Sequence, residues 1–251
     1  MLKIAVLGST QGTDLQTILD AISDSRLTGV NIEFVLSNRS KSGILDRARK
    51  HGIKDIFLSG KGKTRGDYDR EIHQLLVDHQ VQLVLLIGYM KLMTPWFVST
   101  WLNRVVNVHP SLLPAFAGGM DLNVHQEVLN RGCKISGATL IFIDQGADTG
   151  PIISQKVTSV SPTETVSSLK LKIQDLEGEL LVNLIQNFRD DLIRVVRQDT
   201  SCLGILPETV QKLRNLESQP ALNCVINLTP EEWNYLDRSV SLFVSSNNPK
   251  T

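Results

Sequence analysis

Three polar side chains, Asn107, His109 and Asp148, have the chemistry that acyl transfer needs. Asn107 and His109 are two residues apart in a β-branched run that ends at Pro110, and in a strand this spacing places both side chains on one face. Asp148 lies in a Gly-rich turn after a second apolar run. Together, an amide, an imidazole and a carboxylate can stabilise an oxyanion and move a proton. A structural histidine and an ordinary turn aspartate are the simpler alternatives.

A second candidate site is the turn that follows the first predicted strand, residues 2–7. Gly8 and Gly12 flank this turn, and Thr13 and Asp14 open a predicted helix. Backbone N–H groups at the positive end of a helix bind phosphate. The spacing matches neither the dinucleotide fingerprint nor a Walker loop, so an ordinary strand–helix turn stays an alternative. Asp14 would repel a phosphate unless it turns away, and it can instead cap the helix.

The elements that must position these residues alternate between apolar runs and helical patterns. This alternation predicts an α/β fold with a doubly wound, mostly parallel sheet and right-handed crossovers. The most apolar run, residues 81–88, is expected to be the central strand. The other expected strands are 2–7, 31–36, 55–58, the run around Val105 to Val108, 134–143 and 151–157. The expected helices begin near Leu15 and span 40–51, 67–79, 124–130 and 163–188.

The sequence suggests a catalytic domain over residues 1–198 and a small α+β appendage over residues 199–251. The appendage has a helix start at 229–233 and strand-like runs at 222–228 and 240–244. Its apolar residues predict packing on the catalytic domain or on a second copy of the chain, which leaves a homodimer open. Nothing in its residues indicates a function.

The composition excludes several classes of protein. The chain has 26 basic and 26 acidic residues, so it gives no reason to expect a nucleic-acid partner. Its three cysteines lack metal-ligand spacing and are odd in number, which favours a reduced, cytoplasmic setting. The strand-like start at residues 2–7 is no signal peptide, and no apolar run approaches the roughly 18 residues that span a bilayer. We therefore expect small-molecule substrates rather than a membrane or nucleic acid.

Two motifs together resemble a known family. The segment Asn107-Val-His-Pro-Ser-Leu-Leu-Pro114, followed by Asp148-Thr-Gly-Pro151, is similar to the signature of the folate-dependent formyltransferases. The resemblance runs to about residue 190 and is greatest to the phosphoribosylglycinamide (GAR) formyltransferases of purine synthesis. It implies a Rossmann-like fold and transfer of a formyl group from the co-substrate 10-formyltetrahydrofolate to the amine of GAR, without a metal. It also implies that Asn107, His109 and Asp148 are catalytic.

The resemblance further implies two binding regions. The substrate phosphate and ribose would be bound by Gly12, Thr13, Asp14, Gln174 and Glu177. The folate would be bound by Arg65, Met90, Lys91, Leu92, Met93, Ile143 and Asp144. The chain departs from the family pattern at Asp14, Lys91 and Ala115, where the family usually has Asn, Arg and Lys. His125 matches a family histidine near the substrate and can equally be a helix-start residue.

Other functions stay open at this point. A sibling enzyme would formylate methionyl-tRNA or an amino sugar, although a tRNA-binding member should carry a large, basic C-terminal domain. A formyl-folate hydrolase would replace the amine with water, and it usually carries an N-terminal regulatory domain. A non-catalytic folate-binding or scaffold protein is a rival of another class, against which the intact Asn107, His109 and Asp148 argue.

Overall fold

The computed structural model describes residues 1–119, 121–190, 193–196 and 224–227. The chain divides into two compact units, Met1–Arg189 and Asp190–Thr251. In the second unit, β8 (Ile193–Val196) pairs antiparallel with β9 (Cys224–Asn227). β9 lies within the strand expected at 222–228, and β8 was not expected. The helix start at 229–233 and the strand-like run at 240–244 lie outside the described residues.

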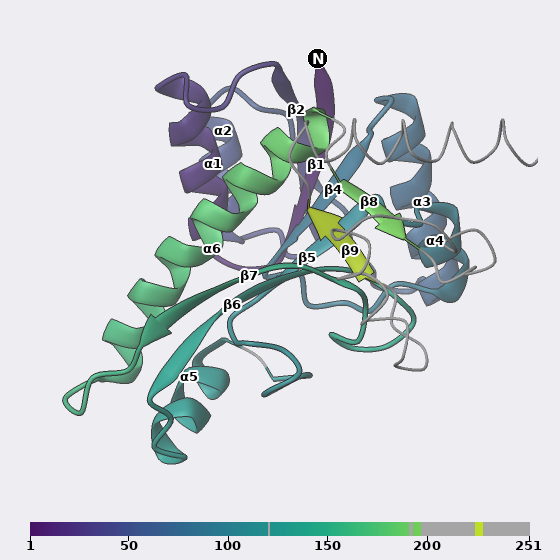
Figure 1. Ribbon diagram of the computed structural model, residues 1–251. Helices are drawn as coiled ribbons and strands as arrows, with labels where there is room; N and C mark the ends of the chain where they lie inside the picture. Colours follow the sequence, from purple (N-terminus) through teal and green to yellow (C-terminus); the bar gives the residue numbers. More distant parts are fainter. Residues whose placement is uncertain (120, 191–192, 197–223, 228–251) are drawn as a thin grey trace, which may run out of the picture. The chain divides into compact units, whose positions relative to one another are not determined.

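The first unit is built on a seven-stranded sheet with helices on both faces (Figure 1). Its strands lie in the order β3-β2-β1-β4-β5-β6-β7. Neighbouring strands from β3 to β5 pair in parallel, and the pairs β5–β6 and β6–β7 are antiparallel. The strands are β1 (Leu2–Gly8), β2 (Val30–Ser37), β3 (Asp55–Phe57), β4 (Leu83–Ile87), β5 (Val105–His109), β6 (Ile135–Phe142) and β7 (Ile152–Ser159). The predicted doubly wound, mostly parallel sheet is therefore confirmed. Its strand order reverses between β1 and β4, which is where open α/β sheets form ligand crevices.

Helices α1, α2 and α6 lie on one side of the sheet and α3 and α4 on the other, whereas α5 contacts α6 (Figure 1). They are α1 (Thr13–Ser23), α2 (Gly43–Lys50), α3 (Arg65–Asp78), α4 (Pro95–Thr100), α5 (Asp121–Asn130) and α6 (Val166–Arg189). Helix α4 was not predicted and has only six residues. The sequence nevertheless contains a helix-start signal, Thr94 followed by Pro95. In the structure the Thr94 side chain caps the helix by accepting a hydrogen bond from the Phe97 N–H, and Pro95 opens the first turn.

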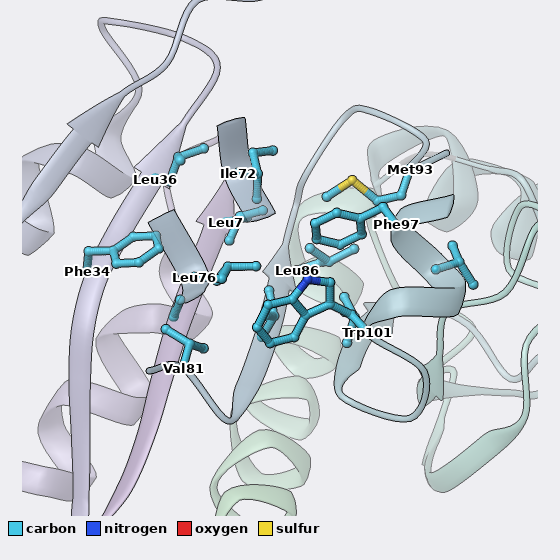
Figure 2. Packing of buried hydrophobic residues seen from close by; sticks show 14 of the residues in the cluster. Leu7, Phe34, Leu36, Ile72, Leu76, Val81, Leu86, Met93, Phe97 and Trp101 are labelled. Carbon is cyan, nitrogen blue, oxygen red and sulfur yellow. The ribbon is translucent and has the colours of Figure 1, made fainter. Parts of the chain in front are cut away.

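The core between the sheet and α3 fixes the strand ends near the crevice. Tyr68, Ile72 and Leu76 recur at helical spacing along α3 and are all buried. Figure 2 shows Ile72 and Leu76 against Leu7, Leu36 and Leu86 of the strands and Phe97 and Trp101 of the α4 region. Burial of each such side chain stabilises the fold by about 1.5–3 kcal/mol. His73 of α3 is half-buried and accepts a hydrogen bond from Trp101 Nε1 at 3.1 Å.

Candidate functional site

A cavity of about 590 Å³ lies where the strand order reverses. The turn after β1, segment 88–93 after β4, the end of β5, loop 143–148 after β6 and one face of α6 form its walls. The sequence-predicted site residues that line it are Gly12, Thr13, Asp14, Met90, Lys91, Leu92, Met93, Asn107, His109, Ile143, Asp144, Asp148, Gln174 and Glu177. Arg65 is different, because it is the exposed first residue of α3 and does not line the cavity.

Asn107, His109 and Asp148 form one hydrogen-bonded group in the cavity wall. Asn107 Nδ2 donates to Asp148 Oδ1 at 3.1 Å, and His109 Nδ1 lies 3.2 Å from Asp148 Oδ2. The side chain of His109 is 3% exposed and that of Asp148 is 14% exposed. The structure therefore brings together three residues that are up to 41 positions apart in sequence.

Two different parts of the backbone position this group. β5 is paired on both sides, parallel with β4 and antiparallel with β6, which holds Asn107 and His109 on one face. The loop that carries Asp148 begins level with the start of β5, since the Ile143 N–H donates to the Val105 carbonyl at 3.0 Å. The loop folds back along the strand, and Asp148 adopts a left-handed conformation with φ 58°. Asp tolerates this conformation better than most residues.

The surroundings of Asp148 favour its ionised form. Burial alone would raise the pKa of this carboxyl, but the hydrogen bond and charge of His109 lower it, together with the N–H groups of Gly118 and Asn107. The net result is a pKa below the usual value for an aspartate. Gly118 contributes through its backbone N–H, which is 3.0 Å from Asp148 Oδ2. No sequence pattern indicates this donor, because it is a main-chain group in a loop without a motif.

The second ring nitrogen of His109 also faces an oxygen atom. His109 Nε2 lies 3.2 Å from the carbonyl oxygen of Phe116, which is in the loop after β5. A neutral imidazole can donate only one hydrogen bond, whereas the imidazolium can donate to Asp148 and to Phe116 at once. The arrangement thus suits a charged ring that can change partner when a better acceptor enters the cavity.

The turn after β1 ends in an uncapped helix start. Gly12, with φ 66°, occupies the N-cap position of α1, and no side chain bonds there. A side chain at Gly12 is excluded, because an added Cβ atom would lie 2.5 Å from Ile44 Cγ1. Thr13 is the first helical residue and Asp14 the second, so the suggestion that Asp14 caps α1 is wrong. Asp14 is 7% exposed and lines the cavity beside the N–H groups of the first turn.

One face of α6 closes the same end of the cavity. Gln174 Nε2 donates to Thr13 Oγ1 at 2.7 Å, which attaches α6 to the first residue of α1. Glu177 is 7% exposed and lines the cavity near it. Lys170 is a further lining residue that the sequence analysis missed. Its signal was available, since positions 170, 174 and 177 share one helix face.

The wall formed by segment 88–93 is more apolar. The Met90 N–H donates to Ser9 Oγ at 3.0 Å, which links this segment to the turn after β1. Met93 is buried, whereas Leu92 is 56% exposed. The Lys91 ammonium lies 4.8 Å from the centroid of the Tyr68 ring, a distance typical of a cation–π contact.

Two other residues that the family resemblance singled out, Asp144 and His125, have different surroundings. The Asp144 carboxylate accepts hydrogen bonds from the Gly146 N–H and from Thr149 Oγ1, so it orders its own loop. His125 lies within α5, is 1% exposed and does not line the cavity.

Two negative findings concern the described part of the chain. Within it, no cluster of three or more His, Cys, Asp or Glu side chains is arranged to hold a metal ion. None of the helices in the described ranges is long and apolar enough to cross a membrane.

Comparison with known proteins gives a consistent result. The sequence profile of the family described as "Formyl transferase" matches residues 2–185. The phosphoribosylglycinamide formyltransferase of Haemophilus influenzae is 33% identical over 196 residues, which cover 78% of this chain and 91% of that protein. Among solved structures, glycinamide ribonucleotide transformylase 1 from Symbiobacterium toebii superposes with a TM-score of 0.73 at 33% identity, covering 78% of this chain and 91% of that chain.

A longer relative matches as well. The trifunctional purine biosynthetic protein adenosine-3 of Chironomus tentans is 36% identical over 177 residues. These residues make up 70% of this chain but only 13% of the length of that protein. The profile match covers most of the chain, and a relative above 30% identity is matched over nearly its full length. The chain therefore belongs to the formyl transferase family.

Proposed function

We propose that this protein transfers a formyl group from 10-formyltetrahydrofolate to the amine of 5′-phosphoribosylglycinamide, a step of purine synthesis. The observation that carries the proposal is the hydrogen-bonded group of Asn107, His109 and Asp148 in a cavity wall. The similarity to the H. influenzae phosphoribosylglycinamide formyltransferase supports this choice of substrate.

The residues of this group match the chemical needs of the reaction. The amine attacks the formyl carbon, the bond from that carbon to N10 of the folate breaks, and the amine loses a proton while N10 gains one. Negative charge builds up on the formyl oxygen before the bond breaks, and preorganised donors stabilise it. Asn107 keeps one amide hydrogen beyond the bond to Asp148, and His109 supplies a second donor by exchanging the Phe116 carbonyl for the formyl oxygen. Asp148 holds the imidazole in orientation and helps move the amine proton.

The two ends of the cavity suit the two substrates. The uncapped start of α1 at Gly12 and Thr13 offers N–H groups to a phosphate, with Gln174 and Glu177 beside it for the ribose. The apolar wall of segment 88–93 and Ile143 suits the flat ring system of a folate. Arg65, which lies outside the cavity lining, has no support from this geometry as a folate ligand.

The test is a turnover assay with both substrates that follows release of tetrahydrofolate and formation of the formylated product. We expect both products to appear in equal amounts and only when GAR is present. Release of tetrahydrofolate at the same rate without GAR would indicate a hydrolase instead. Folate binding without turnover on GAR, on methionyl-tRNA or on an amino sugar would indicate a non-catalytic protein.

A further inference from the structure

Helices α1 and α6 lie side by side and run in the same direction (Figure 1). Two contacts define how they are aligned. Gln174 bonds to Thr13, and Gly178 packs so closely on Thr17 that an added Cβ atom would lie 2.6 Å from Thr17 Cγ2. The second contact lies four residues after the first on both helices. The two helices are therefore parallel and aligned turn by turn.

This alignment places Lys170 beyond the start of α1. Lys170 is one helical turn, about 5.4 Å, before Gln174 on the same face of α6. Because Gln174 is opposite the first residue of α1, the turn that carries Lys170 has no part of α1 opposite it. It flanks instead the space beyond the N-terminal end of α1. Lys170 is half-buried and lines the cavity, as a group beside a bound ligand should.

Two carboxylates and one lysine line this end of the cavity. Asp14 and Glu177 are acidic, are almost fully buried and line the cavity close to the start of α1. Carboxylates here would disfavour a phosphate dianion. The two lysines of the cavity lining are Lys91 and Lys170. Lys91 lies at the other wall, over the Tyr68 ring, which leaves Lys170 as the lysine on the helix beside the α1 start.

We propose that Lys170 binds the phosphate of the substrate and offsets the negative charge that Asp14 brings to this site. Lys170 is then a specificity-determining residue for phosphorylated amine substrates, and it acts on binding rather than on the transfer step. This inference rests on the proposed function, because it takes the substrate phosphate to bind at the start of α1.

The experiment compares Lys170→Met with Lys170→Arg and with a matched control, Lys172→Met. Lys172 is on the same helix and also half-buried, but it pairs with Glu164 and lies outside the cavity lining. Formyl transfer is measured with GAR and with the glycinamide ribonucleoside that lacks the phosphate. We expect Lys170→Met to raise the KM for GAR on the order of 10-fold, with kcat and the KM for the folate nearly unchanged. Lys170→Arg and Lys172→Met should stay close to the wild type.

The dephosphorylated substrate separates binding of the phosphate from a structural role. Lys170→Met should leave kcat/KM for this substrate unchanged, and equal losses with both substrates would overturn the proposal. The double variant Asp14→Asn with Lys170→Met removes one charge of each sign, so its KM for GAR should return toward the wild-type value. A double variant whose KM for GAR is as high as that of Lys170→Met would show that Lys170 does not offset the charge of Asp14.

A failure of the proposed function has a different outcome. In that case the wild-type protein does not formylate GAR at all, and Lys170 is tested by calorimetric titration with inorganic phosphate. Weaker phosphate binding by Lys170→Met than by Lys172→Met supports the inference without any turnover. Equal phosphate binding by the two variants overturns it.

Discussion

Replacing Asp148 with asparagine removes one charge and leaves the shape of the side chain almost unchanged. Three donors bond to this carboxylate: the Asn107 amide, the His109 ring and the Gly118 N–H. Asparagine accepts through only one oxygen, so its amide nitrogen must face at least one of these donors. The left-handed backbone at residue 148 is no obstacle, because asparagine adopts it as readily as aspartate.

The expected loss follows from these contacts. A hydrogen bond to a charged group contributes about 1.5–3 kcal/mol. In the variant either the amide nitrogen faces His109, or Asn107 loses its bond and His109 keeps only a neutral acceptor. If the loss falls on the transition state, each 1.36 kcal/mol lowers turnover about tenfold. We therefore expect Asp148→Asn to lower kcat on the order of 100-fold, with little change in the KM for either substrate.

The assay is steady-state formyl transfer by the wild type and by two variants, with thermal unfolding measured alongside. The control is Asp46→Asn, which removes a carboxylate from an exposed ion pair with Arg49 and should change neither quantity much. Turnover of Asp148→Asn within a few-fold of the wild type would refute the assignment of Asp148 to the reaction. A large loss of thermal stability together with a loss of soluble protein would instead assign Asp148 a structural role.

Four further expectations concern the phosphate site, the titration of Asp148, two glycines and the C-terminal extension. Asp14→Asn should lower the KM for GAR several-fold, and an unchanged KM would mean that the carboxylate points away from the phosphate. Because folding lowers the pKa of Asp148, its carboxylate stabilises the fold above the unfolded-state pKa of about 3.9, and this contribution is lost as the pH falls through the lower folded-state pKa. The difference in stability between the wild type and Asp148→Asn, from denaturant melts, should thus shrink with falling pH over that range and stay constant above it. Gly8→Ala should lower the free energy of unfolding by about 1–3 kcal/mol, since the new Cβ would lie 2.7 Å from the Ile87 carbonyl oxygen, while Gly66→Ala, whose nearest contact is at 3.8 Å, should not. A chain that ends at residue 198 should keep formyl transfer and lose thermal stability or change its oligomeric state; an equally stable, monodisperse but inactive chain would assign the C-terminal extension to the site.

Much of the sheet was predictable because most strands of a buried parallel sheet are continuous apolar runs. The run at 81–88 contains β4, and the run around Val105 contains β5, as expected. Short elements were harder, since the six residues of α4 are too few to show a period. The alternative role of Asp14 as the cap of α1 was wrong because a glycine in a left-handed conformation takes the cap position.

The site was predictable only where regular secondary structure determines it. The two-residue spacing of Asn107 and His109 predicted that they share one face, and β5 bears this out. Nothing periodic predicts that the loop of Asp148 folds back to meet them, so only the resemblance to a family united the three residues. For the same reason the Gly118 N–H and the Phe116 carbonyl, which are main-chain groups of an irregular loop, left no trace in the sequence.

The strand order has a consequence for how the protein folds. Within the seven-stranded sheet, each pair of neighbouring strands is consecutive in sequence except β1 and β4, which join Ile4 to Leu83. Loop closure across nearly 80 residues is entropically costly and slows folding. The strands from β1 to β3 and those from β4 to β7 can each pair locally before this junction forms. The cavity takes residues from both groups, so we expect enzymatic activity to return during refolding only in the last, slowest kinetic phase.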